Sequence, residues 1–166
     1  VPTSSTTAQL ALGDAIAISL MLQKKFNKKN FKKFHPSGNL GKKLRTVEDI
    51  MLTKNKLPLI DEKATLGQAI KIINSKKLGV AIVINKKKET VGIFTDGDIK
   101  RTLQKNENLK KLVIKSLMTK NPISVEKDVL AAKAIGIMNE KKITSLCVHS
   151  KSKKKKTIGI LHIHNL

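Results

Sequence analysis

The alternation of apolar and polar positions along the chain stops at one turn near its middle. Val91, Ile93 and Phe94 suit a short buried strand, and Thr95 follows where the N-cap of a helix would stand. Asp98 comes three residues later, the spacing of a capping box, in which a hydroxyl and a carboxylate satisfy free N–H groups at a helix start. The same two groups beside free N–H donors could instead hold the ribose and phosphate of a nucleotide. The spacing leaves both interpretations open.

This pattern occurs a second time at the end of the chain. Residues 157–166 align with residues 90–99, glycine on glycine and aliphatic on aliphatic. The likeness extends backwards, since residues 47–51 align with residues 114–118. A period of about sixty residues is longer than a solenoid repeat and shorter than an independent large domain. Each copy is predicted to contain a short Ile/Leu-Met segment, a short strand, an amphipathic helix, two strands around a polar loop, and the turn.

The duplicated pattern, which reads GIFTDGDI at residues 92–99, resembles a tandem pair of CBS domains. The resemblance implies an α/β fold of two βαββα units, which we place at residues 45–106 and 107–166. Each unit is too small for a stable core of its own, so we expect the two sheets to face one another. Known pairs of this kind commonly bind adenine or other nucleotides in the cleft between the copies. The resemblance therefore implies a nucleotide or sugar-nucleotide effector near Thr95 and Asp98.

The second copy departs from the nucleotide-binding pattern. His162 stands in place of the hydroxyl residue and Asn165 in place of the carboxylate. An amide can still hydrogen-bond a ribose hydroxyl, but it carries no charge, so this second nucleotide site is expected to be the weaker one. His162 and His164 alternate as two ligands on one side of a strand would. Two histidines without a nearby Cys, Asp or Glu are a thin ligand set, so we predict no metal site.

Residues 1–44 follow a different pattern. Apolar residues at helical spacing predict a helix of about five turns that reaches residue 22, with N-cap candidates at Ser5, Thr6 and Thr7. One face of this helix is more apolar than a lone surface helix needs, so we expect it to dock on a part of a longer protein or on a partner subunit. The chain begins at Val1 and not at Met, which is typical of a cut.

A lysine-rich segment and a loop follow this helix. Phe26, Phe31 and Phe34 are interleaved with lysines, and their spacing permits a short helix with the rings on one side. Phenylalanine at such spacing is more often part of a core than of a nucleic-acid surface. His35 then opens a loop punctuated by one proline and two glycines. A lone histidine before proline is usually a structural or surface residue, so its spacing alone does not make it catalytic.

Three motifs occur in order before the CBS pair: PTSSTTA at residues 2–8, LGDA at 12–15 and HPSGNLGKKL at 35–44. Together they resemble the second half of the D-arabinose 5-phosphate isomerases, which join a sugar isomerase (SIS) domain to a C-terminal CBS pair. Residues 1–44 are then the C-terminal helical remnant of an SIS domain. The resemblance also implies a sugar phosphate substrate, a tetramer, and a place in making the eight-carbon sugar acid of lipopolysaccharide.

The same resemblance makes His35 a catalytic residue, because it matches the histidine of the family's His-Pro-x-Gly loop. Conversion of an aldose phosphate to a ketose phosphate needs a group that both accepts and donates a proton. Imidazole can do this near neutral pH without a metal or an organic cofactor, so no cofactor is predicted. The remaining catalytic groups are expected before Val1, and the chain alone is therefore expected to be inactive.

Composition argues against the obvious alternative for so basic a protein. The formal net charge is +22, yet only Arg45 and Arg101 are arginines, and the chain has four Phe with no Tyr or Trp. Base and phosphate recognition favours the arginine fork and stacking aromatic rings, so we predict no nucleic-acid partner. The lysine run at 151–156 occupies the same place in its copy as residues 85–89. It is expected to be a solvated hairpin loop, with contact to a phosphate or an acidic surface as the alternative.

Other features point to the cytoplasm. Cys147 is the single cysteine, which fits a reducing compartment. No uninterrupted apolar stretch approaches the length of a membrane span, and residues 8–22 are interrupted by Asp14 and lack a basic region before them. We therefore predict neither a membrane segment nor a signal peptide. Three functions stay open: part of an isomerase with a regulatory pair, a stand-alone nucleotide sensor, and a basic nucleic-acid binder.

Overall fold

The computed structural model describes residues 2–27, 30, 34, 44–105, 112–153 and 155–165. The chain divides into two compact units, Val1–Leu44 and Arg45–Leu166. Each unit is described by itself below, and the second contains both copies of the repeat.

The first unit contains the predicted long helix, α1 (Thr3–Gln23). The expected N-caps at Ser5, Thr6 and Thr7 were wrong. Their hydroxyls lie inside the helix and donate to the carbonyl oxygens of Pro2 and Thr3 one turn back, while the helix begins without a side-chain cap. Serine and threonine readily bond the preceding turn in this way, which removes them as caps.

None of the residues of α1 is buried, and the expectation of one apolar face was wrong, because its apolar side chains lie on all sides of the helix. By length and composition alone α1 could cross a membrane, although signal sequences and core helices of soluble proteins share these properties. After it, the rings of Phe26 and Phe34 stack with centroids 6.2 Å apart. Phe31 and His35 lie outside the described residues.

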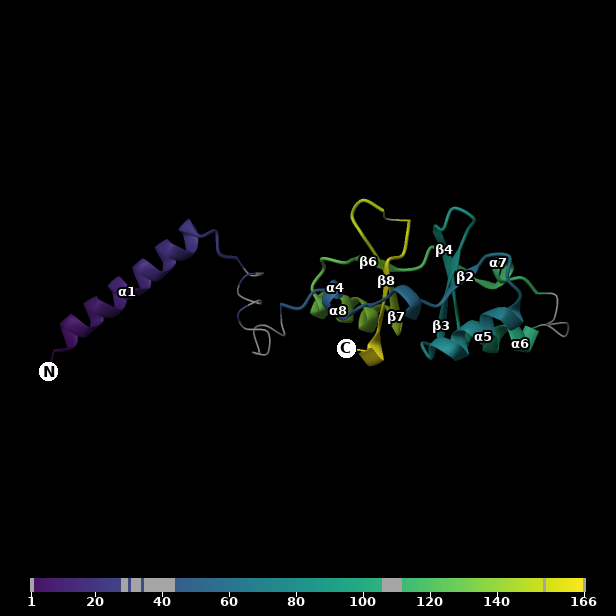
Figure 1. The fold of residues 1–166 in the computed structure, drawn as a ribbon. Coiled ribbons are helices and arrows are strands. Elements are labelled where there is room, and N and C mark those ends of the chain that lie inside the picture. Colours follow the sequence, from purple (N-terminus) through teal and green to yellow (C-terminus); the bar gives the residue numbers. More distant parts are fainter. Residues whose placement is uncertain are drawn as a thin grey trace. The chain divides into compact units, whose positions relative to one another are not determined.

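Two four-stranded sheets build the second unit (Figure 1). In each sheet the strand before the main helix pairs in parallel with the strand after it, and the remaining pairs are antiparallel. The first sheet has the order β2 (Leu59–Asp61), β3 (Val80–Ile84), β4 (Thr90–Thr95), β5 (Thr119–Lys120). The second has the order β1 (Leu52–Thr53), β8 (Gly159–His162), β7 (Ser145–His149), β6 (Ser124–Glu126).

One main helix packs on each sheet. The apolar faces of α5 (Leu66–Lys76) and α8 (Ala131–Lys141) cover the first and the second sheet. Helix α6 (Asp96–Lys105) follows β4, whereas β8 is followed by the short 3-10 turn η3 (Ile163–Asn165). The remaining helices are α4 (Val47–Ile50), η1 (Lys54–Lys56) and α7 (Ile114–Leu117). The order strand, helix, strand, strand, turn therefore appears twice, as the repeat predicted.

The first helix and strand of each copy belong structurally to the other copy. Strand β1 pairs with β8, and β5 pairs with β4. Val47 of α4 is buried in the core of the second copy, where its N–H donates to the carbonyl oxygen of Val129 at 2.8 Å. Ile114 of α7 is buried in the core of the first copy and donates to Ala64 at 2.9 Å. Neither core is complete without a segment from the other copy.

The two sheets face one another through a shared apolar layer, as expected from the small size of each copy. This layer consists of Leu78, Val80, Ile82, Cys147 and Ile160. Thr90 and Thr157 are equivalent positions of the repeat, and their hydroxyls hydrogen-bond each other at 2.7 Å. Contact between equivalent residues places them on a local twofold axis that relates the two copies.

Two ion pairs tie the exchanged segments to their hosts. Glu48 pairs with Lys127 at 2.8 Å, and Lys115 pairs with Glu62 at 3.1 Å. Glu48 and Lys115 are equivalent in the repeat, as are Glu62 and Lys127. If each segment packed on its own copy, Glu48 would face Glu62 and Lys115 would face Lys127. Like charges in contact are unfavourable, so the reversed charges favour the exchange.

Gly92 of β4 gives a test of the exchange, because the exchanged segment passes directly over it. An added Cβ would lie 2.8 Å from the carbonyl oxygen of Thr119 and 2.6 Å from the sulfur of Met118. We expect Gly92→Ala to lower the free energy of unfolding by about 1–3 kcal/mol, measured by urea denaturation, because overpacking forces β5 away. Gly136→Ala in α8 is the control, since a Cβ there meets nothing within 4 Å and should stabilise by about 0.5–1 kcal/mol. Equal effects at the two glycines would contradict the close packing of β5 on β4.

Candidate functional site

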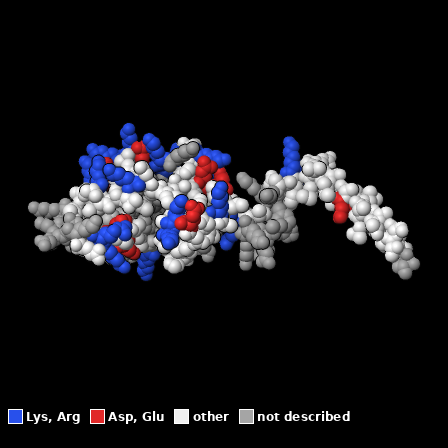
Figure 2. Space-filling view, turned by 180° about the vertical axis from the view of Figure 1, so that it is seen from behind, with Lys and Arg blue, Asp and Glu red and all other residues white. Residues whose placement is uncertain are grey.

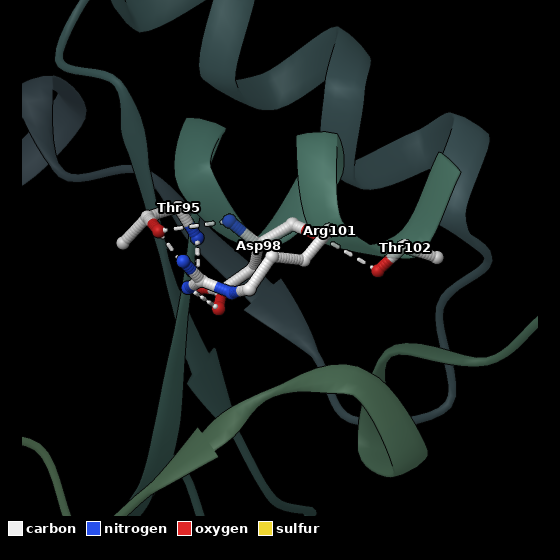
Figure 3. A network of polar contacts seen from close by, with 4 residues as sticks. All are labelled: Thr95, Asp98, Arg101 and Thr102. Carbon is white, nitrogen blue, oxygen red and sulfur yellow. Dashed lines mark hydrogen bonds and ion pairs between the residues drawn. The ribbon is translucent and has the colours of Figure 1, made fainter. Parts of the chain in front are cut away.

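The turn between β4 and α6 is a complete capping box (Figure 3). The backbone N–H of Thr95 donates to Oδ2 of Asp98 at 2.8 Å, and the Thr95 hydroxyl lies 2.7 Å from the same oxygen. In return, the backbone N–H of Asp98 donates to the Thr95 hydroxyl at 3.3 Å. The capping box predicted from the sequence is thereby confirmed. It fixes the Thr95 hydroxyl and the Asp98 carboxylate at the start of a helix.

Arg101 completes this polar group and was missed as a site residue at the sequence level. Its guanidinium donates to the second carboxylate oxygen of Asp98 at 2.6 Å (Figure 3). The side chain of Arg101 is 64% exposed, whereas that of Asp98 is only 10% exposed. The spacing of three residues on a predicted helix was the available signal, since such residues share one helix face. One carboxylate oxygen of Asp98 is thus held by the capping box and the other by the exposed guanidinium of Arg101.

A close backbone approach lies beside the box. The N–H of Asp96 donates to the carbonyl oxygen of Gly79 at 3.0 Å, and Gly79 has a positive φ of 62°. A Cβ on Gly79 would come within 2.9 Å of the Asp96 carboxylate. Glycine is therefore required here both for its backbone conformation and for space, which keeps the start of α6 against the start of β3.

A cavity of about 120 Å³ opens between the two sheets next to this turn. Val80, which pairs with Thr95, and Ile93, two residues before Thr95 on the same strand face, line it from the first sheet. The other lining residues are Thr119, Pro122, Ile123, Ile143, Ser145, Cys147 and Ile160. The cavity is smaller than most ligand pockets, which measure roughly 300–1,000 Å³, so it suits one ring of a ligand whose remainder lies outside.

The walls of this cavity are apolar apart from a few groups. The Ser145 hydroxyl is buried and has no hydrogen-bond partner among the described residues. Burial raises the pKa of the Cys147 thiol to about 11, although a hydrogen bond with Thr157 acts in the opposite direction. The thiol therefore stays protonated at neutral pH, and Ser145 is left as an unsatisfied polar group facing a ring-sized apolar space. A larger hollow of about 620 Å³ over β2 and α5 shares no lining residue with this cavity.

The second turn differs from the first as its sequence suggested. His162 takes the position of Thr95 at the end of its strand and is 7% exposed. Burial lowers the pKa of His162, nearby His164 lowers it further, and a hydrogen bond with the backbone of Leu78 opposes both. The Ile163 N–H donates to Thr144 at 2.9 Å, as Asp96 does to Gly79 in the first copy. The backbone frame of the turn is thus repeated, while its hydroxyl and carboxylate are not.

The two remaining predicted site residues, Asn165 and His35, fall partly or wholly outside the described part of the chain. Asn165 lies in η3, and its side chain is outside the described part of the chain. His35 also lies outside the described residues. Among the residues that are described, no group of three or more His, Cys, Asp or Glu side chains is arranged to hold a metal ion.

Comparison with known proteins identifies the class first. The CBS domain family matches residues 47–105 and 114–166, and the chain belongs to that family as a tandem pair. The arabinose 5-phosphate isomerase KdsD of Salmonella typhimurium is 38% identical to the chain over 166 residues, which is 99% of this chain and 50% of the relative. The uncharacterized protein RP505 of Rickettsia prowazekii is 35% identical over 165 residues with the same coverage. The chain spans about half the length of the curated relatives it matches, and it matches their C-terminal half.

Solved structures confirm the fold of the second unit. A crystal structure of CBSX2 in complex with AMP matches 72% of this chain and 91% of that chain, with a TM-score of 0.61 and 28% identity. The CBS domain protein PAE2072 from Pyrobaculum aerophilum, complexed with AMP, matches 74% of this chain and 90% of that chain, with a TM-score of 0.65 and 19% identity. The latter likeness concerns the fold alone.

The buried histidine predicts a pH dependence of stability. The folded state lowers the pKa of His162 below its usual value of 6.5, so the unfolded chain binds the proton more readily. Stability from this group is present above about pH 6.5 and is lost as the pH falls through the folded pKa. We expect the free energy of unfolding to fall between about pH 8 and pH 5, and His162→Gln to flatten that fall. His149→Gln in β7 is the control. If both substitutions changed the pH dependence of the free energy of unfolding equally, His162 would not be its source.

Proposed function

We propose that the chain is the C-terminal, regulatory part of a D-arabinose 5-phosphate isomerase. The observation that carries this proposal is a difference in coverage. CBS-pair structures match 72–74% of the chain, whereas the KdsD relative matches 99% of it. The additional likeness covers the first unit, with its PTSSTTA, LGDA and HPSGNLGKKL motifs. A stand-alone nucleotide-sensing CBS module has no use for this segment, which makes that function the second candidate.

In the proposed reaction, D-arabinose 5-phosphate and D-ribulose 5-phosphate interconvert through an enediol. One carbon loses a proton and its neighbour gains one, while a proton also passes from the hydroxyl oxygen to the carbonyl oxygen, which further groups must assist. Between the two carbons, a single base that takes up the proton and returns it suffices. We assign this role to His35, whose imidazole changes charge near neutral pH. The clamp for the sugar phosphate and the remaining catalytic groups belong to the SIS domain that precedes this segment in the proposed parent. No metal or organic cofactor takes part in the proposal.

Helix α1 fits an SIS domain in this proposal. Its apolar side chains include Leu10, Ile18 and Leu22, which are 70%, 58% and 75% exposed. The apolar side chains lie on all sides of α1 and form no single face, which is typical of a helix that is buried all round. We therefore assign α1 to the interior of the sugar isomerase domain or to a partner subunit. Asp14 near its middle favours that assignment over a membrane span. A cytoplasmic homotetramer completes the proposal for the parent enzyme.

The regulatory ligand is proposed to be an adenine nucleotide in the cleft between the copies. Its base occupies the cavity beside Ile93, where the Ser145 hydroxyl offers a hydrogen bond. Ribose hydroxyls replace Arg101 on the outer oxygen of Asp98, and the phosphate then meets the guanidinium and the start of α6. The AMP complex of CBSX2, which is 28% identical to this chain, supports this ligand class. His162 and Asn165 make the second, weaker site, because that turn lacks a carboxylate.

A basic nucleic-acid binder is the third candidate. The charge of +22 favours it, but the scarcity of arginine and aromatic residues does not. Affinity for DNA that is independent of sequence and collapses as salt is raised would mark simple charge attraction.

Nucleotide binding is tested by calorimetry with AMP. We expect Asp98→Ala to weaken binding by more than about tenfold, or 1.4 kcal/mol, because the ribose loses its charged acceptor. Asn165→Ala should have a smaller effect. Gln68→Ala is a matched control, since Gln68 closes the capping box of α5 with Thr65 as Asp98 does with Thr95. Equal losses of AMP affinity in Asp98→Ala and Asn165→Ala would contradict the proposal that the first site is the stronger one. Equal losses in Asp98→Ala and Gln68→Ala would show that Asp98 acts only as a helix cap.

The isomerase assignment is tested with two assays of D-arabinose 5-phosphate turnover. The 166-residue chain alone should be inactive, because an isolated imidazole has neither substrate clamp nor partner, and positioning supplies much of such a rate enhancement. In the longer parent protein, His35→Ala should lower turnover about a hundredfold to ten-thousandfold. Turnover by the chain alone would show that the catalytic groups are misassigned. Near-normal activity of the substituted parent would return His35 to a structural role.

A further inference from the structure

The two β-hairpins of the CBS pair bring their tips together at the end of the unit opposite the Thr95 turn. The first hairpin tip connects β3 to β4, and the second connects β7 to β8. Thr90 and Thr157, at the bases of the two tips, share the 2.7 Å hydrogen bond on the local twofold axis. The N–H of Thr90 also donates to the carbonyl oxygen of Lys155 at 2.7 Å. Since β4 has six residues, about 17 Å separates the tips from the nucleotide turn.

A hollow of about 460 Å³ lies between the two tips and is lined almost entirely by lysines. We call these six residues the hairpin lysine cluster: Lys87, Lys88, Lys151, Lys153, Lys155 and Lys156. All six are exposed, and none makes an ion pair within the described part of the chain. Figure 2 shows Lys and Arg side chains along the upper edge of the unit, with Asp and Glu side chains among them. By contrast, Lys115 pairs with Glu62, and Lys127 pairs with Glu48.

One carboxylate, Glu89, lines the hollow with them, and the loop itself already engages it. Its Oε2 accepts a hydrogen bond from the Asn85 side chain at 3.0 Å. The Asn85 side-chain oxygen in turn accepts from the N–H groups of Lys87 and Glu89, each at 2.9 Å. Lys88 has a positive φ of 58°, a conformation in which glycine or asparagine is usual. The hydrogen bonds of Asn85 and Glu89 thus hold the first tip together, and the lysine side chains are not needed for the turn itself.

Six like charges around one small hollow repel one another, and the single carboxylate among the lining residues, Glu89, compensates only part of them. A compact anion with several negative charges would replace this repulsion by attraction and would hold both tips at once. Lysine suits such a ligand, because its ammonium is a point charge that binds phosphate without needing the planar fork of arginine. The hollow is open, has no aromatic ring for a base to stack on, and is the size of a few phosphate groups.

We propose that the hairpin lysine cluster is a binding site for an oligophosphate group, bridged between the two hairpin tips and separate from the nucleotide cleft. The proposal does not depend on the isomerase assignment, since it uses only residues of the CBS pair. It accounts for the lysine run at 151–156, which the nucleotide site does not use. The anion is either free or the oligophosphate part of a larger molecule, and the shared chemistry is the chain of phosphates.

The test uses inorganic tripolyphosphate, titrated calorimetrically into the 166-residue chain at about 0.15 M salt, where long-range attraction is screened. Four lysines of the cluster are changed to Gln in one variant: Lys87, Lys88, Lys151 and Lys153. The control variant removes the same charge from lysines that line other hollows: Lys54, Lys56, Lys63 and Lys71. We expect the cluster variant to lose at least about tenfold in affinity and the control less than about threefold.

Two further measurements separate this site from its alternatives. Changing only Lys87 and Lys88, or only Lys151 and Lys153, should each weaken tripolyphosphate, because the anion spans both tips. Excess AMP should leave tripolyphosphate binding unchanged, so a failed nucleotide site does not affect this result. Equal losses in the cluster and control variants would overturn the proposal in favour of general charge attraction. Binding of duplex DNA that is tighter than that of tripolyphosphate, and lost in the cluster variant, would overturn it in favour of nucleic acid.

Discussion

The fold depends on the exchange of a short helix and a strand between the two copies. Each copy alone has a sheet with an open edge and a core with a missing residue, and in each case the other copy supplies both. Val47 fills the core around Val125 and Leu146, while Ile114 fills the equivalent space in the first copy. The shared layer between the sheets then buries the remaining apolar face. Small domains bury too little surface to be stable alone, and exchange turns two such domains into one cooperative unit.

The near-symmetry of this unit makes its departures from symmetry informative. The reversed ion pairs, Glu48 with Lys127 and Lys115 with Glu62, give each exchanged segment a partner of the opposite charge only on the other copy. Pairs this exposed contribute little energy, but like charges would oppose the wrong arrangement, which makes them suited to specificity. The Thr90–Thr157 hydrogen bond lies on the twofold axis and joins two identical residues, so it needs no charge difference between the copies.

The same frame presents different chemistry at its two ends. At the turn end, the backbone is repeated but only the first copy carries the capping box with its buried carboxylate, so one strong nucleotide site is proposed where symmetry would allow two. At the tip end, both copies contribute lysines to one hollow, so a single anion site is proposed across the axis. Strands β4 and β8 connect the ends. A ligand at the tips therefore lies on the same rigid elements that position Thr95 and His162.

The sequence by itself determined the duplication, the strand–helix order of each copy, and the Thr95–Asp98 box, because these depend on periodicity and on residues three apart. It also determined the asymmetry of the turns, since His162 and Asn165 can be read directly. Only the tertiary structure decided the exchange of α4 and α7, the reversed ion pairs, and the contact of Arg101 with Asp98. It also decided the cavity at Ser145 and the meeting of the two lysine tips. These features join residues far apart in the chain or depend on a side-chain direction, and no local pattern records which distant surfaces will meet.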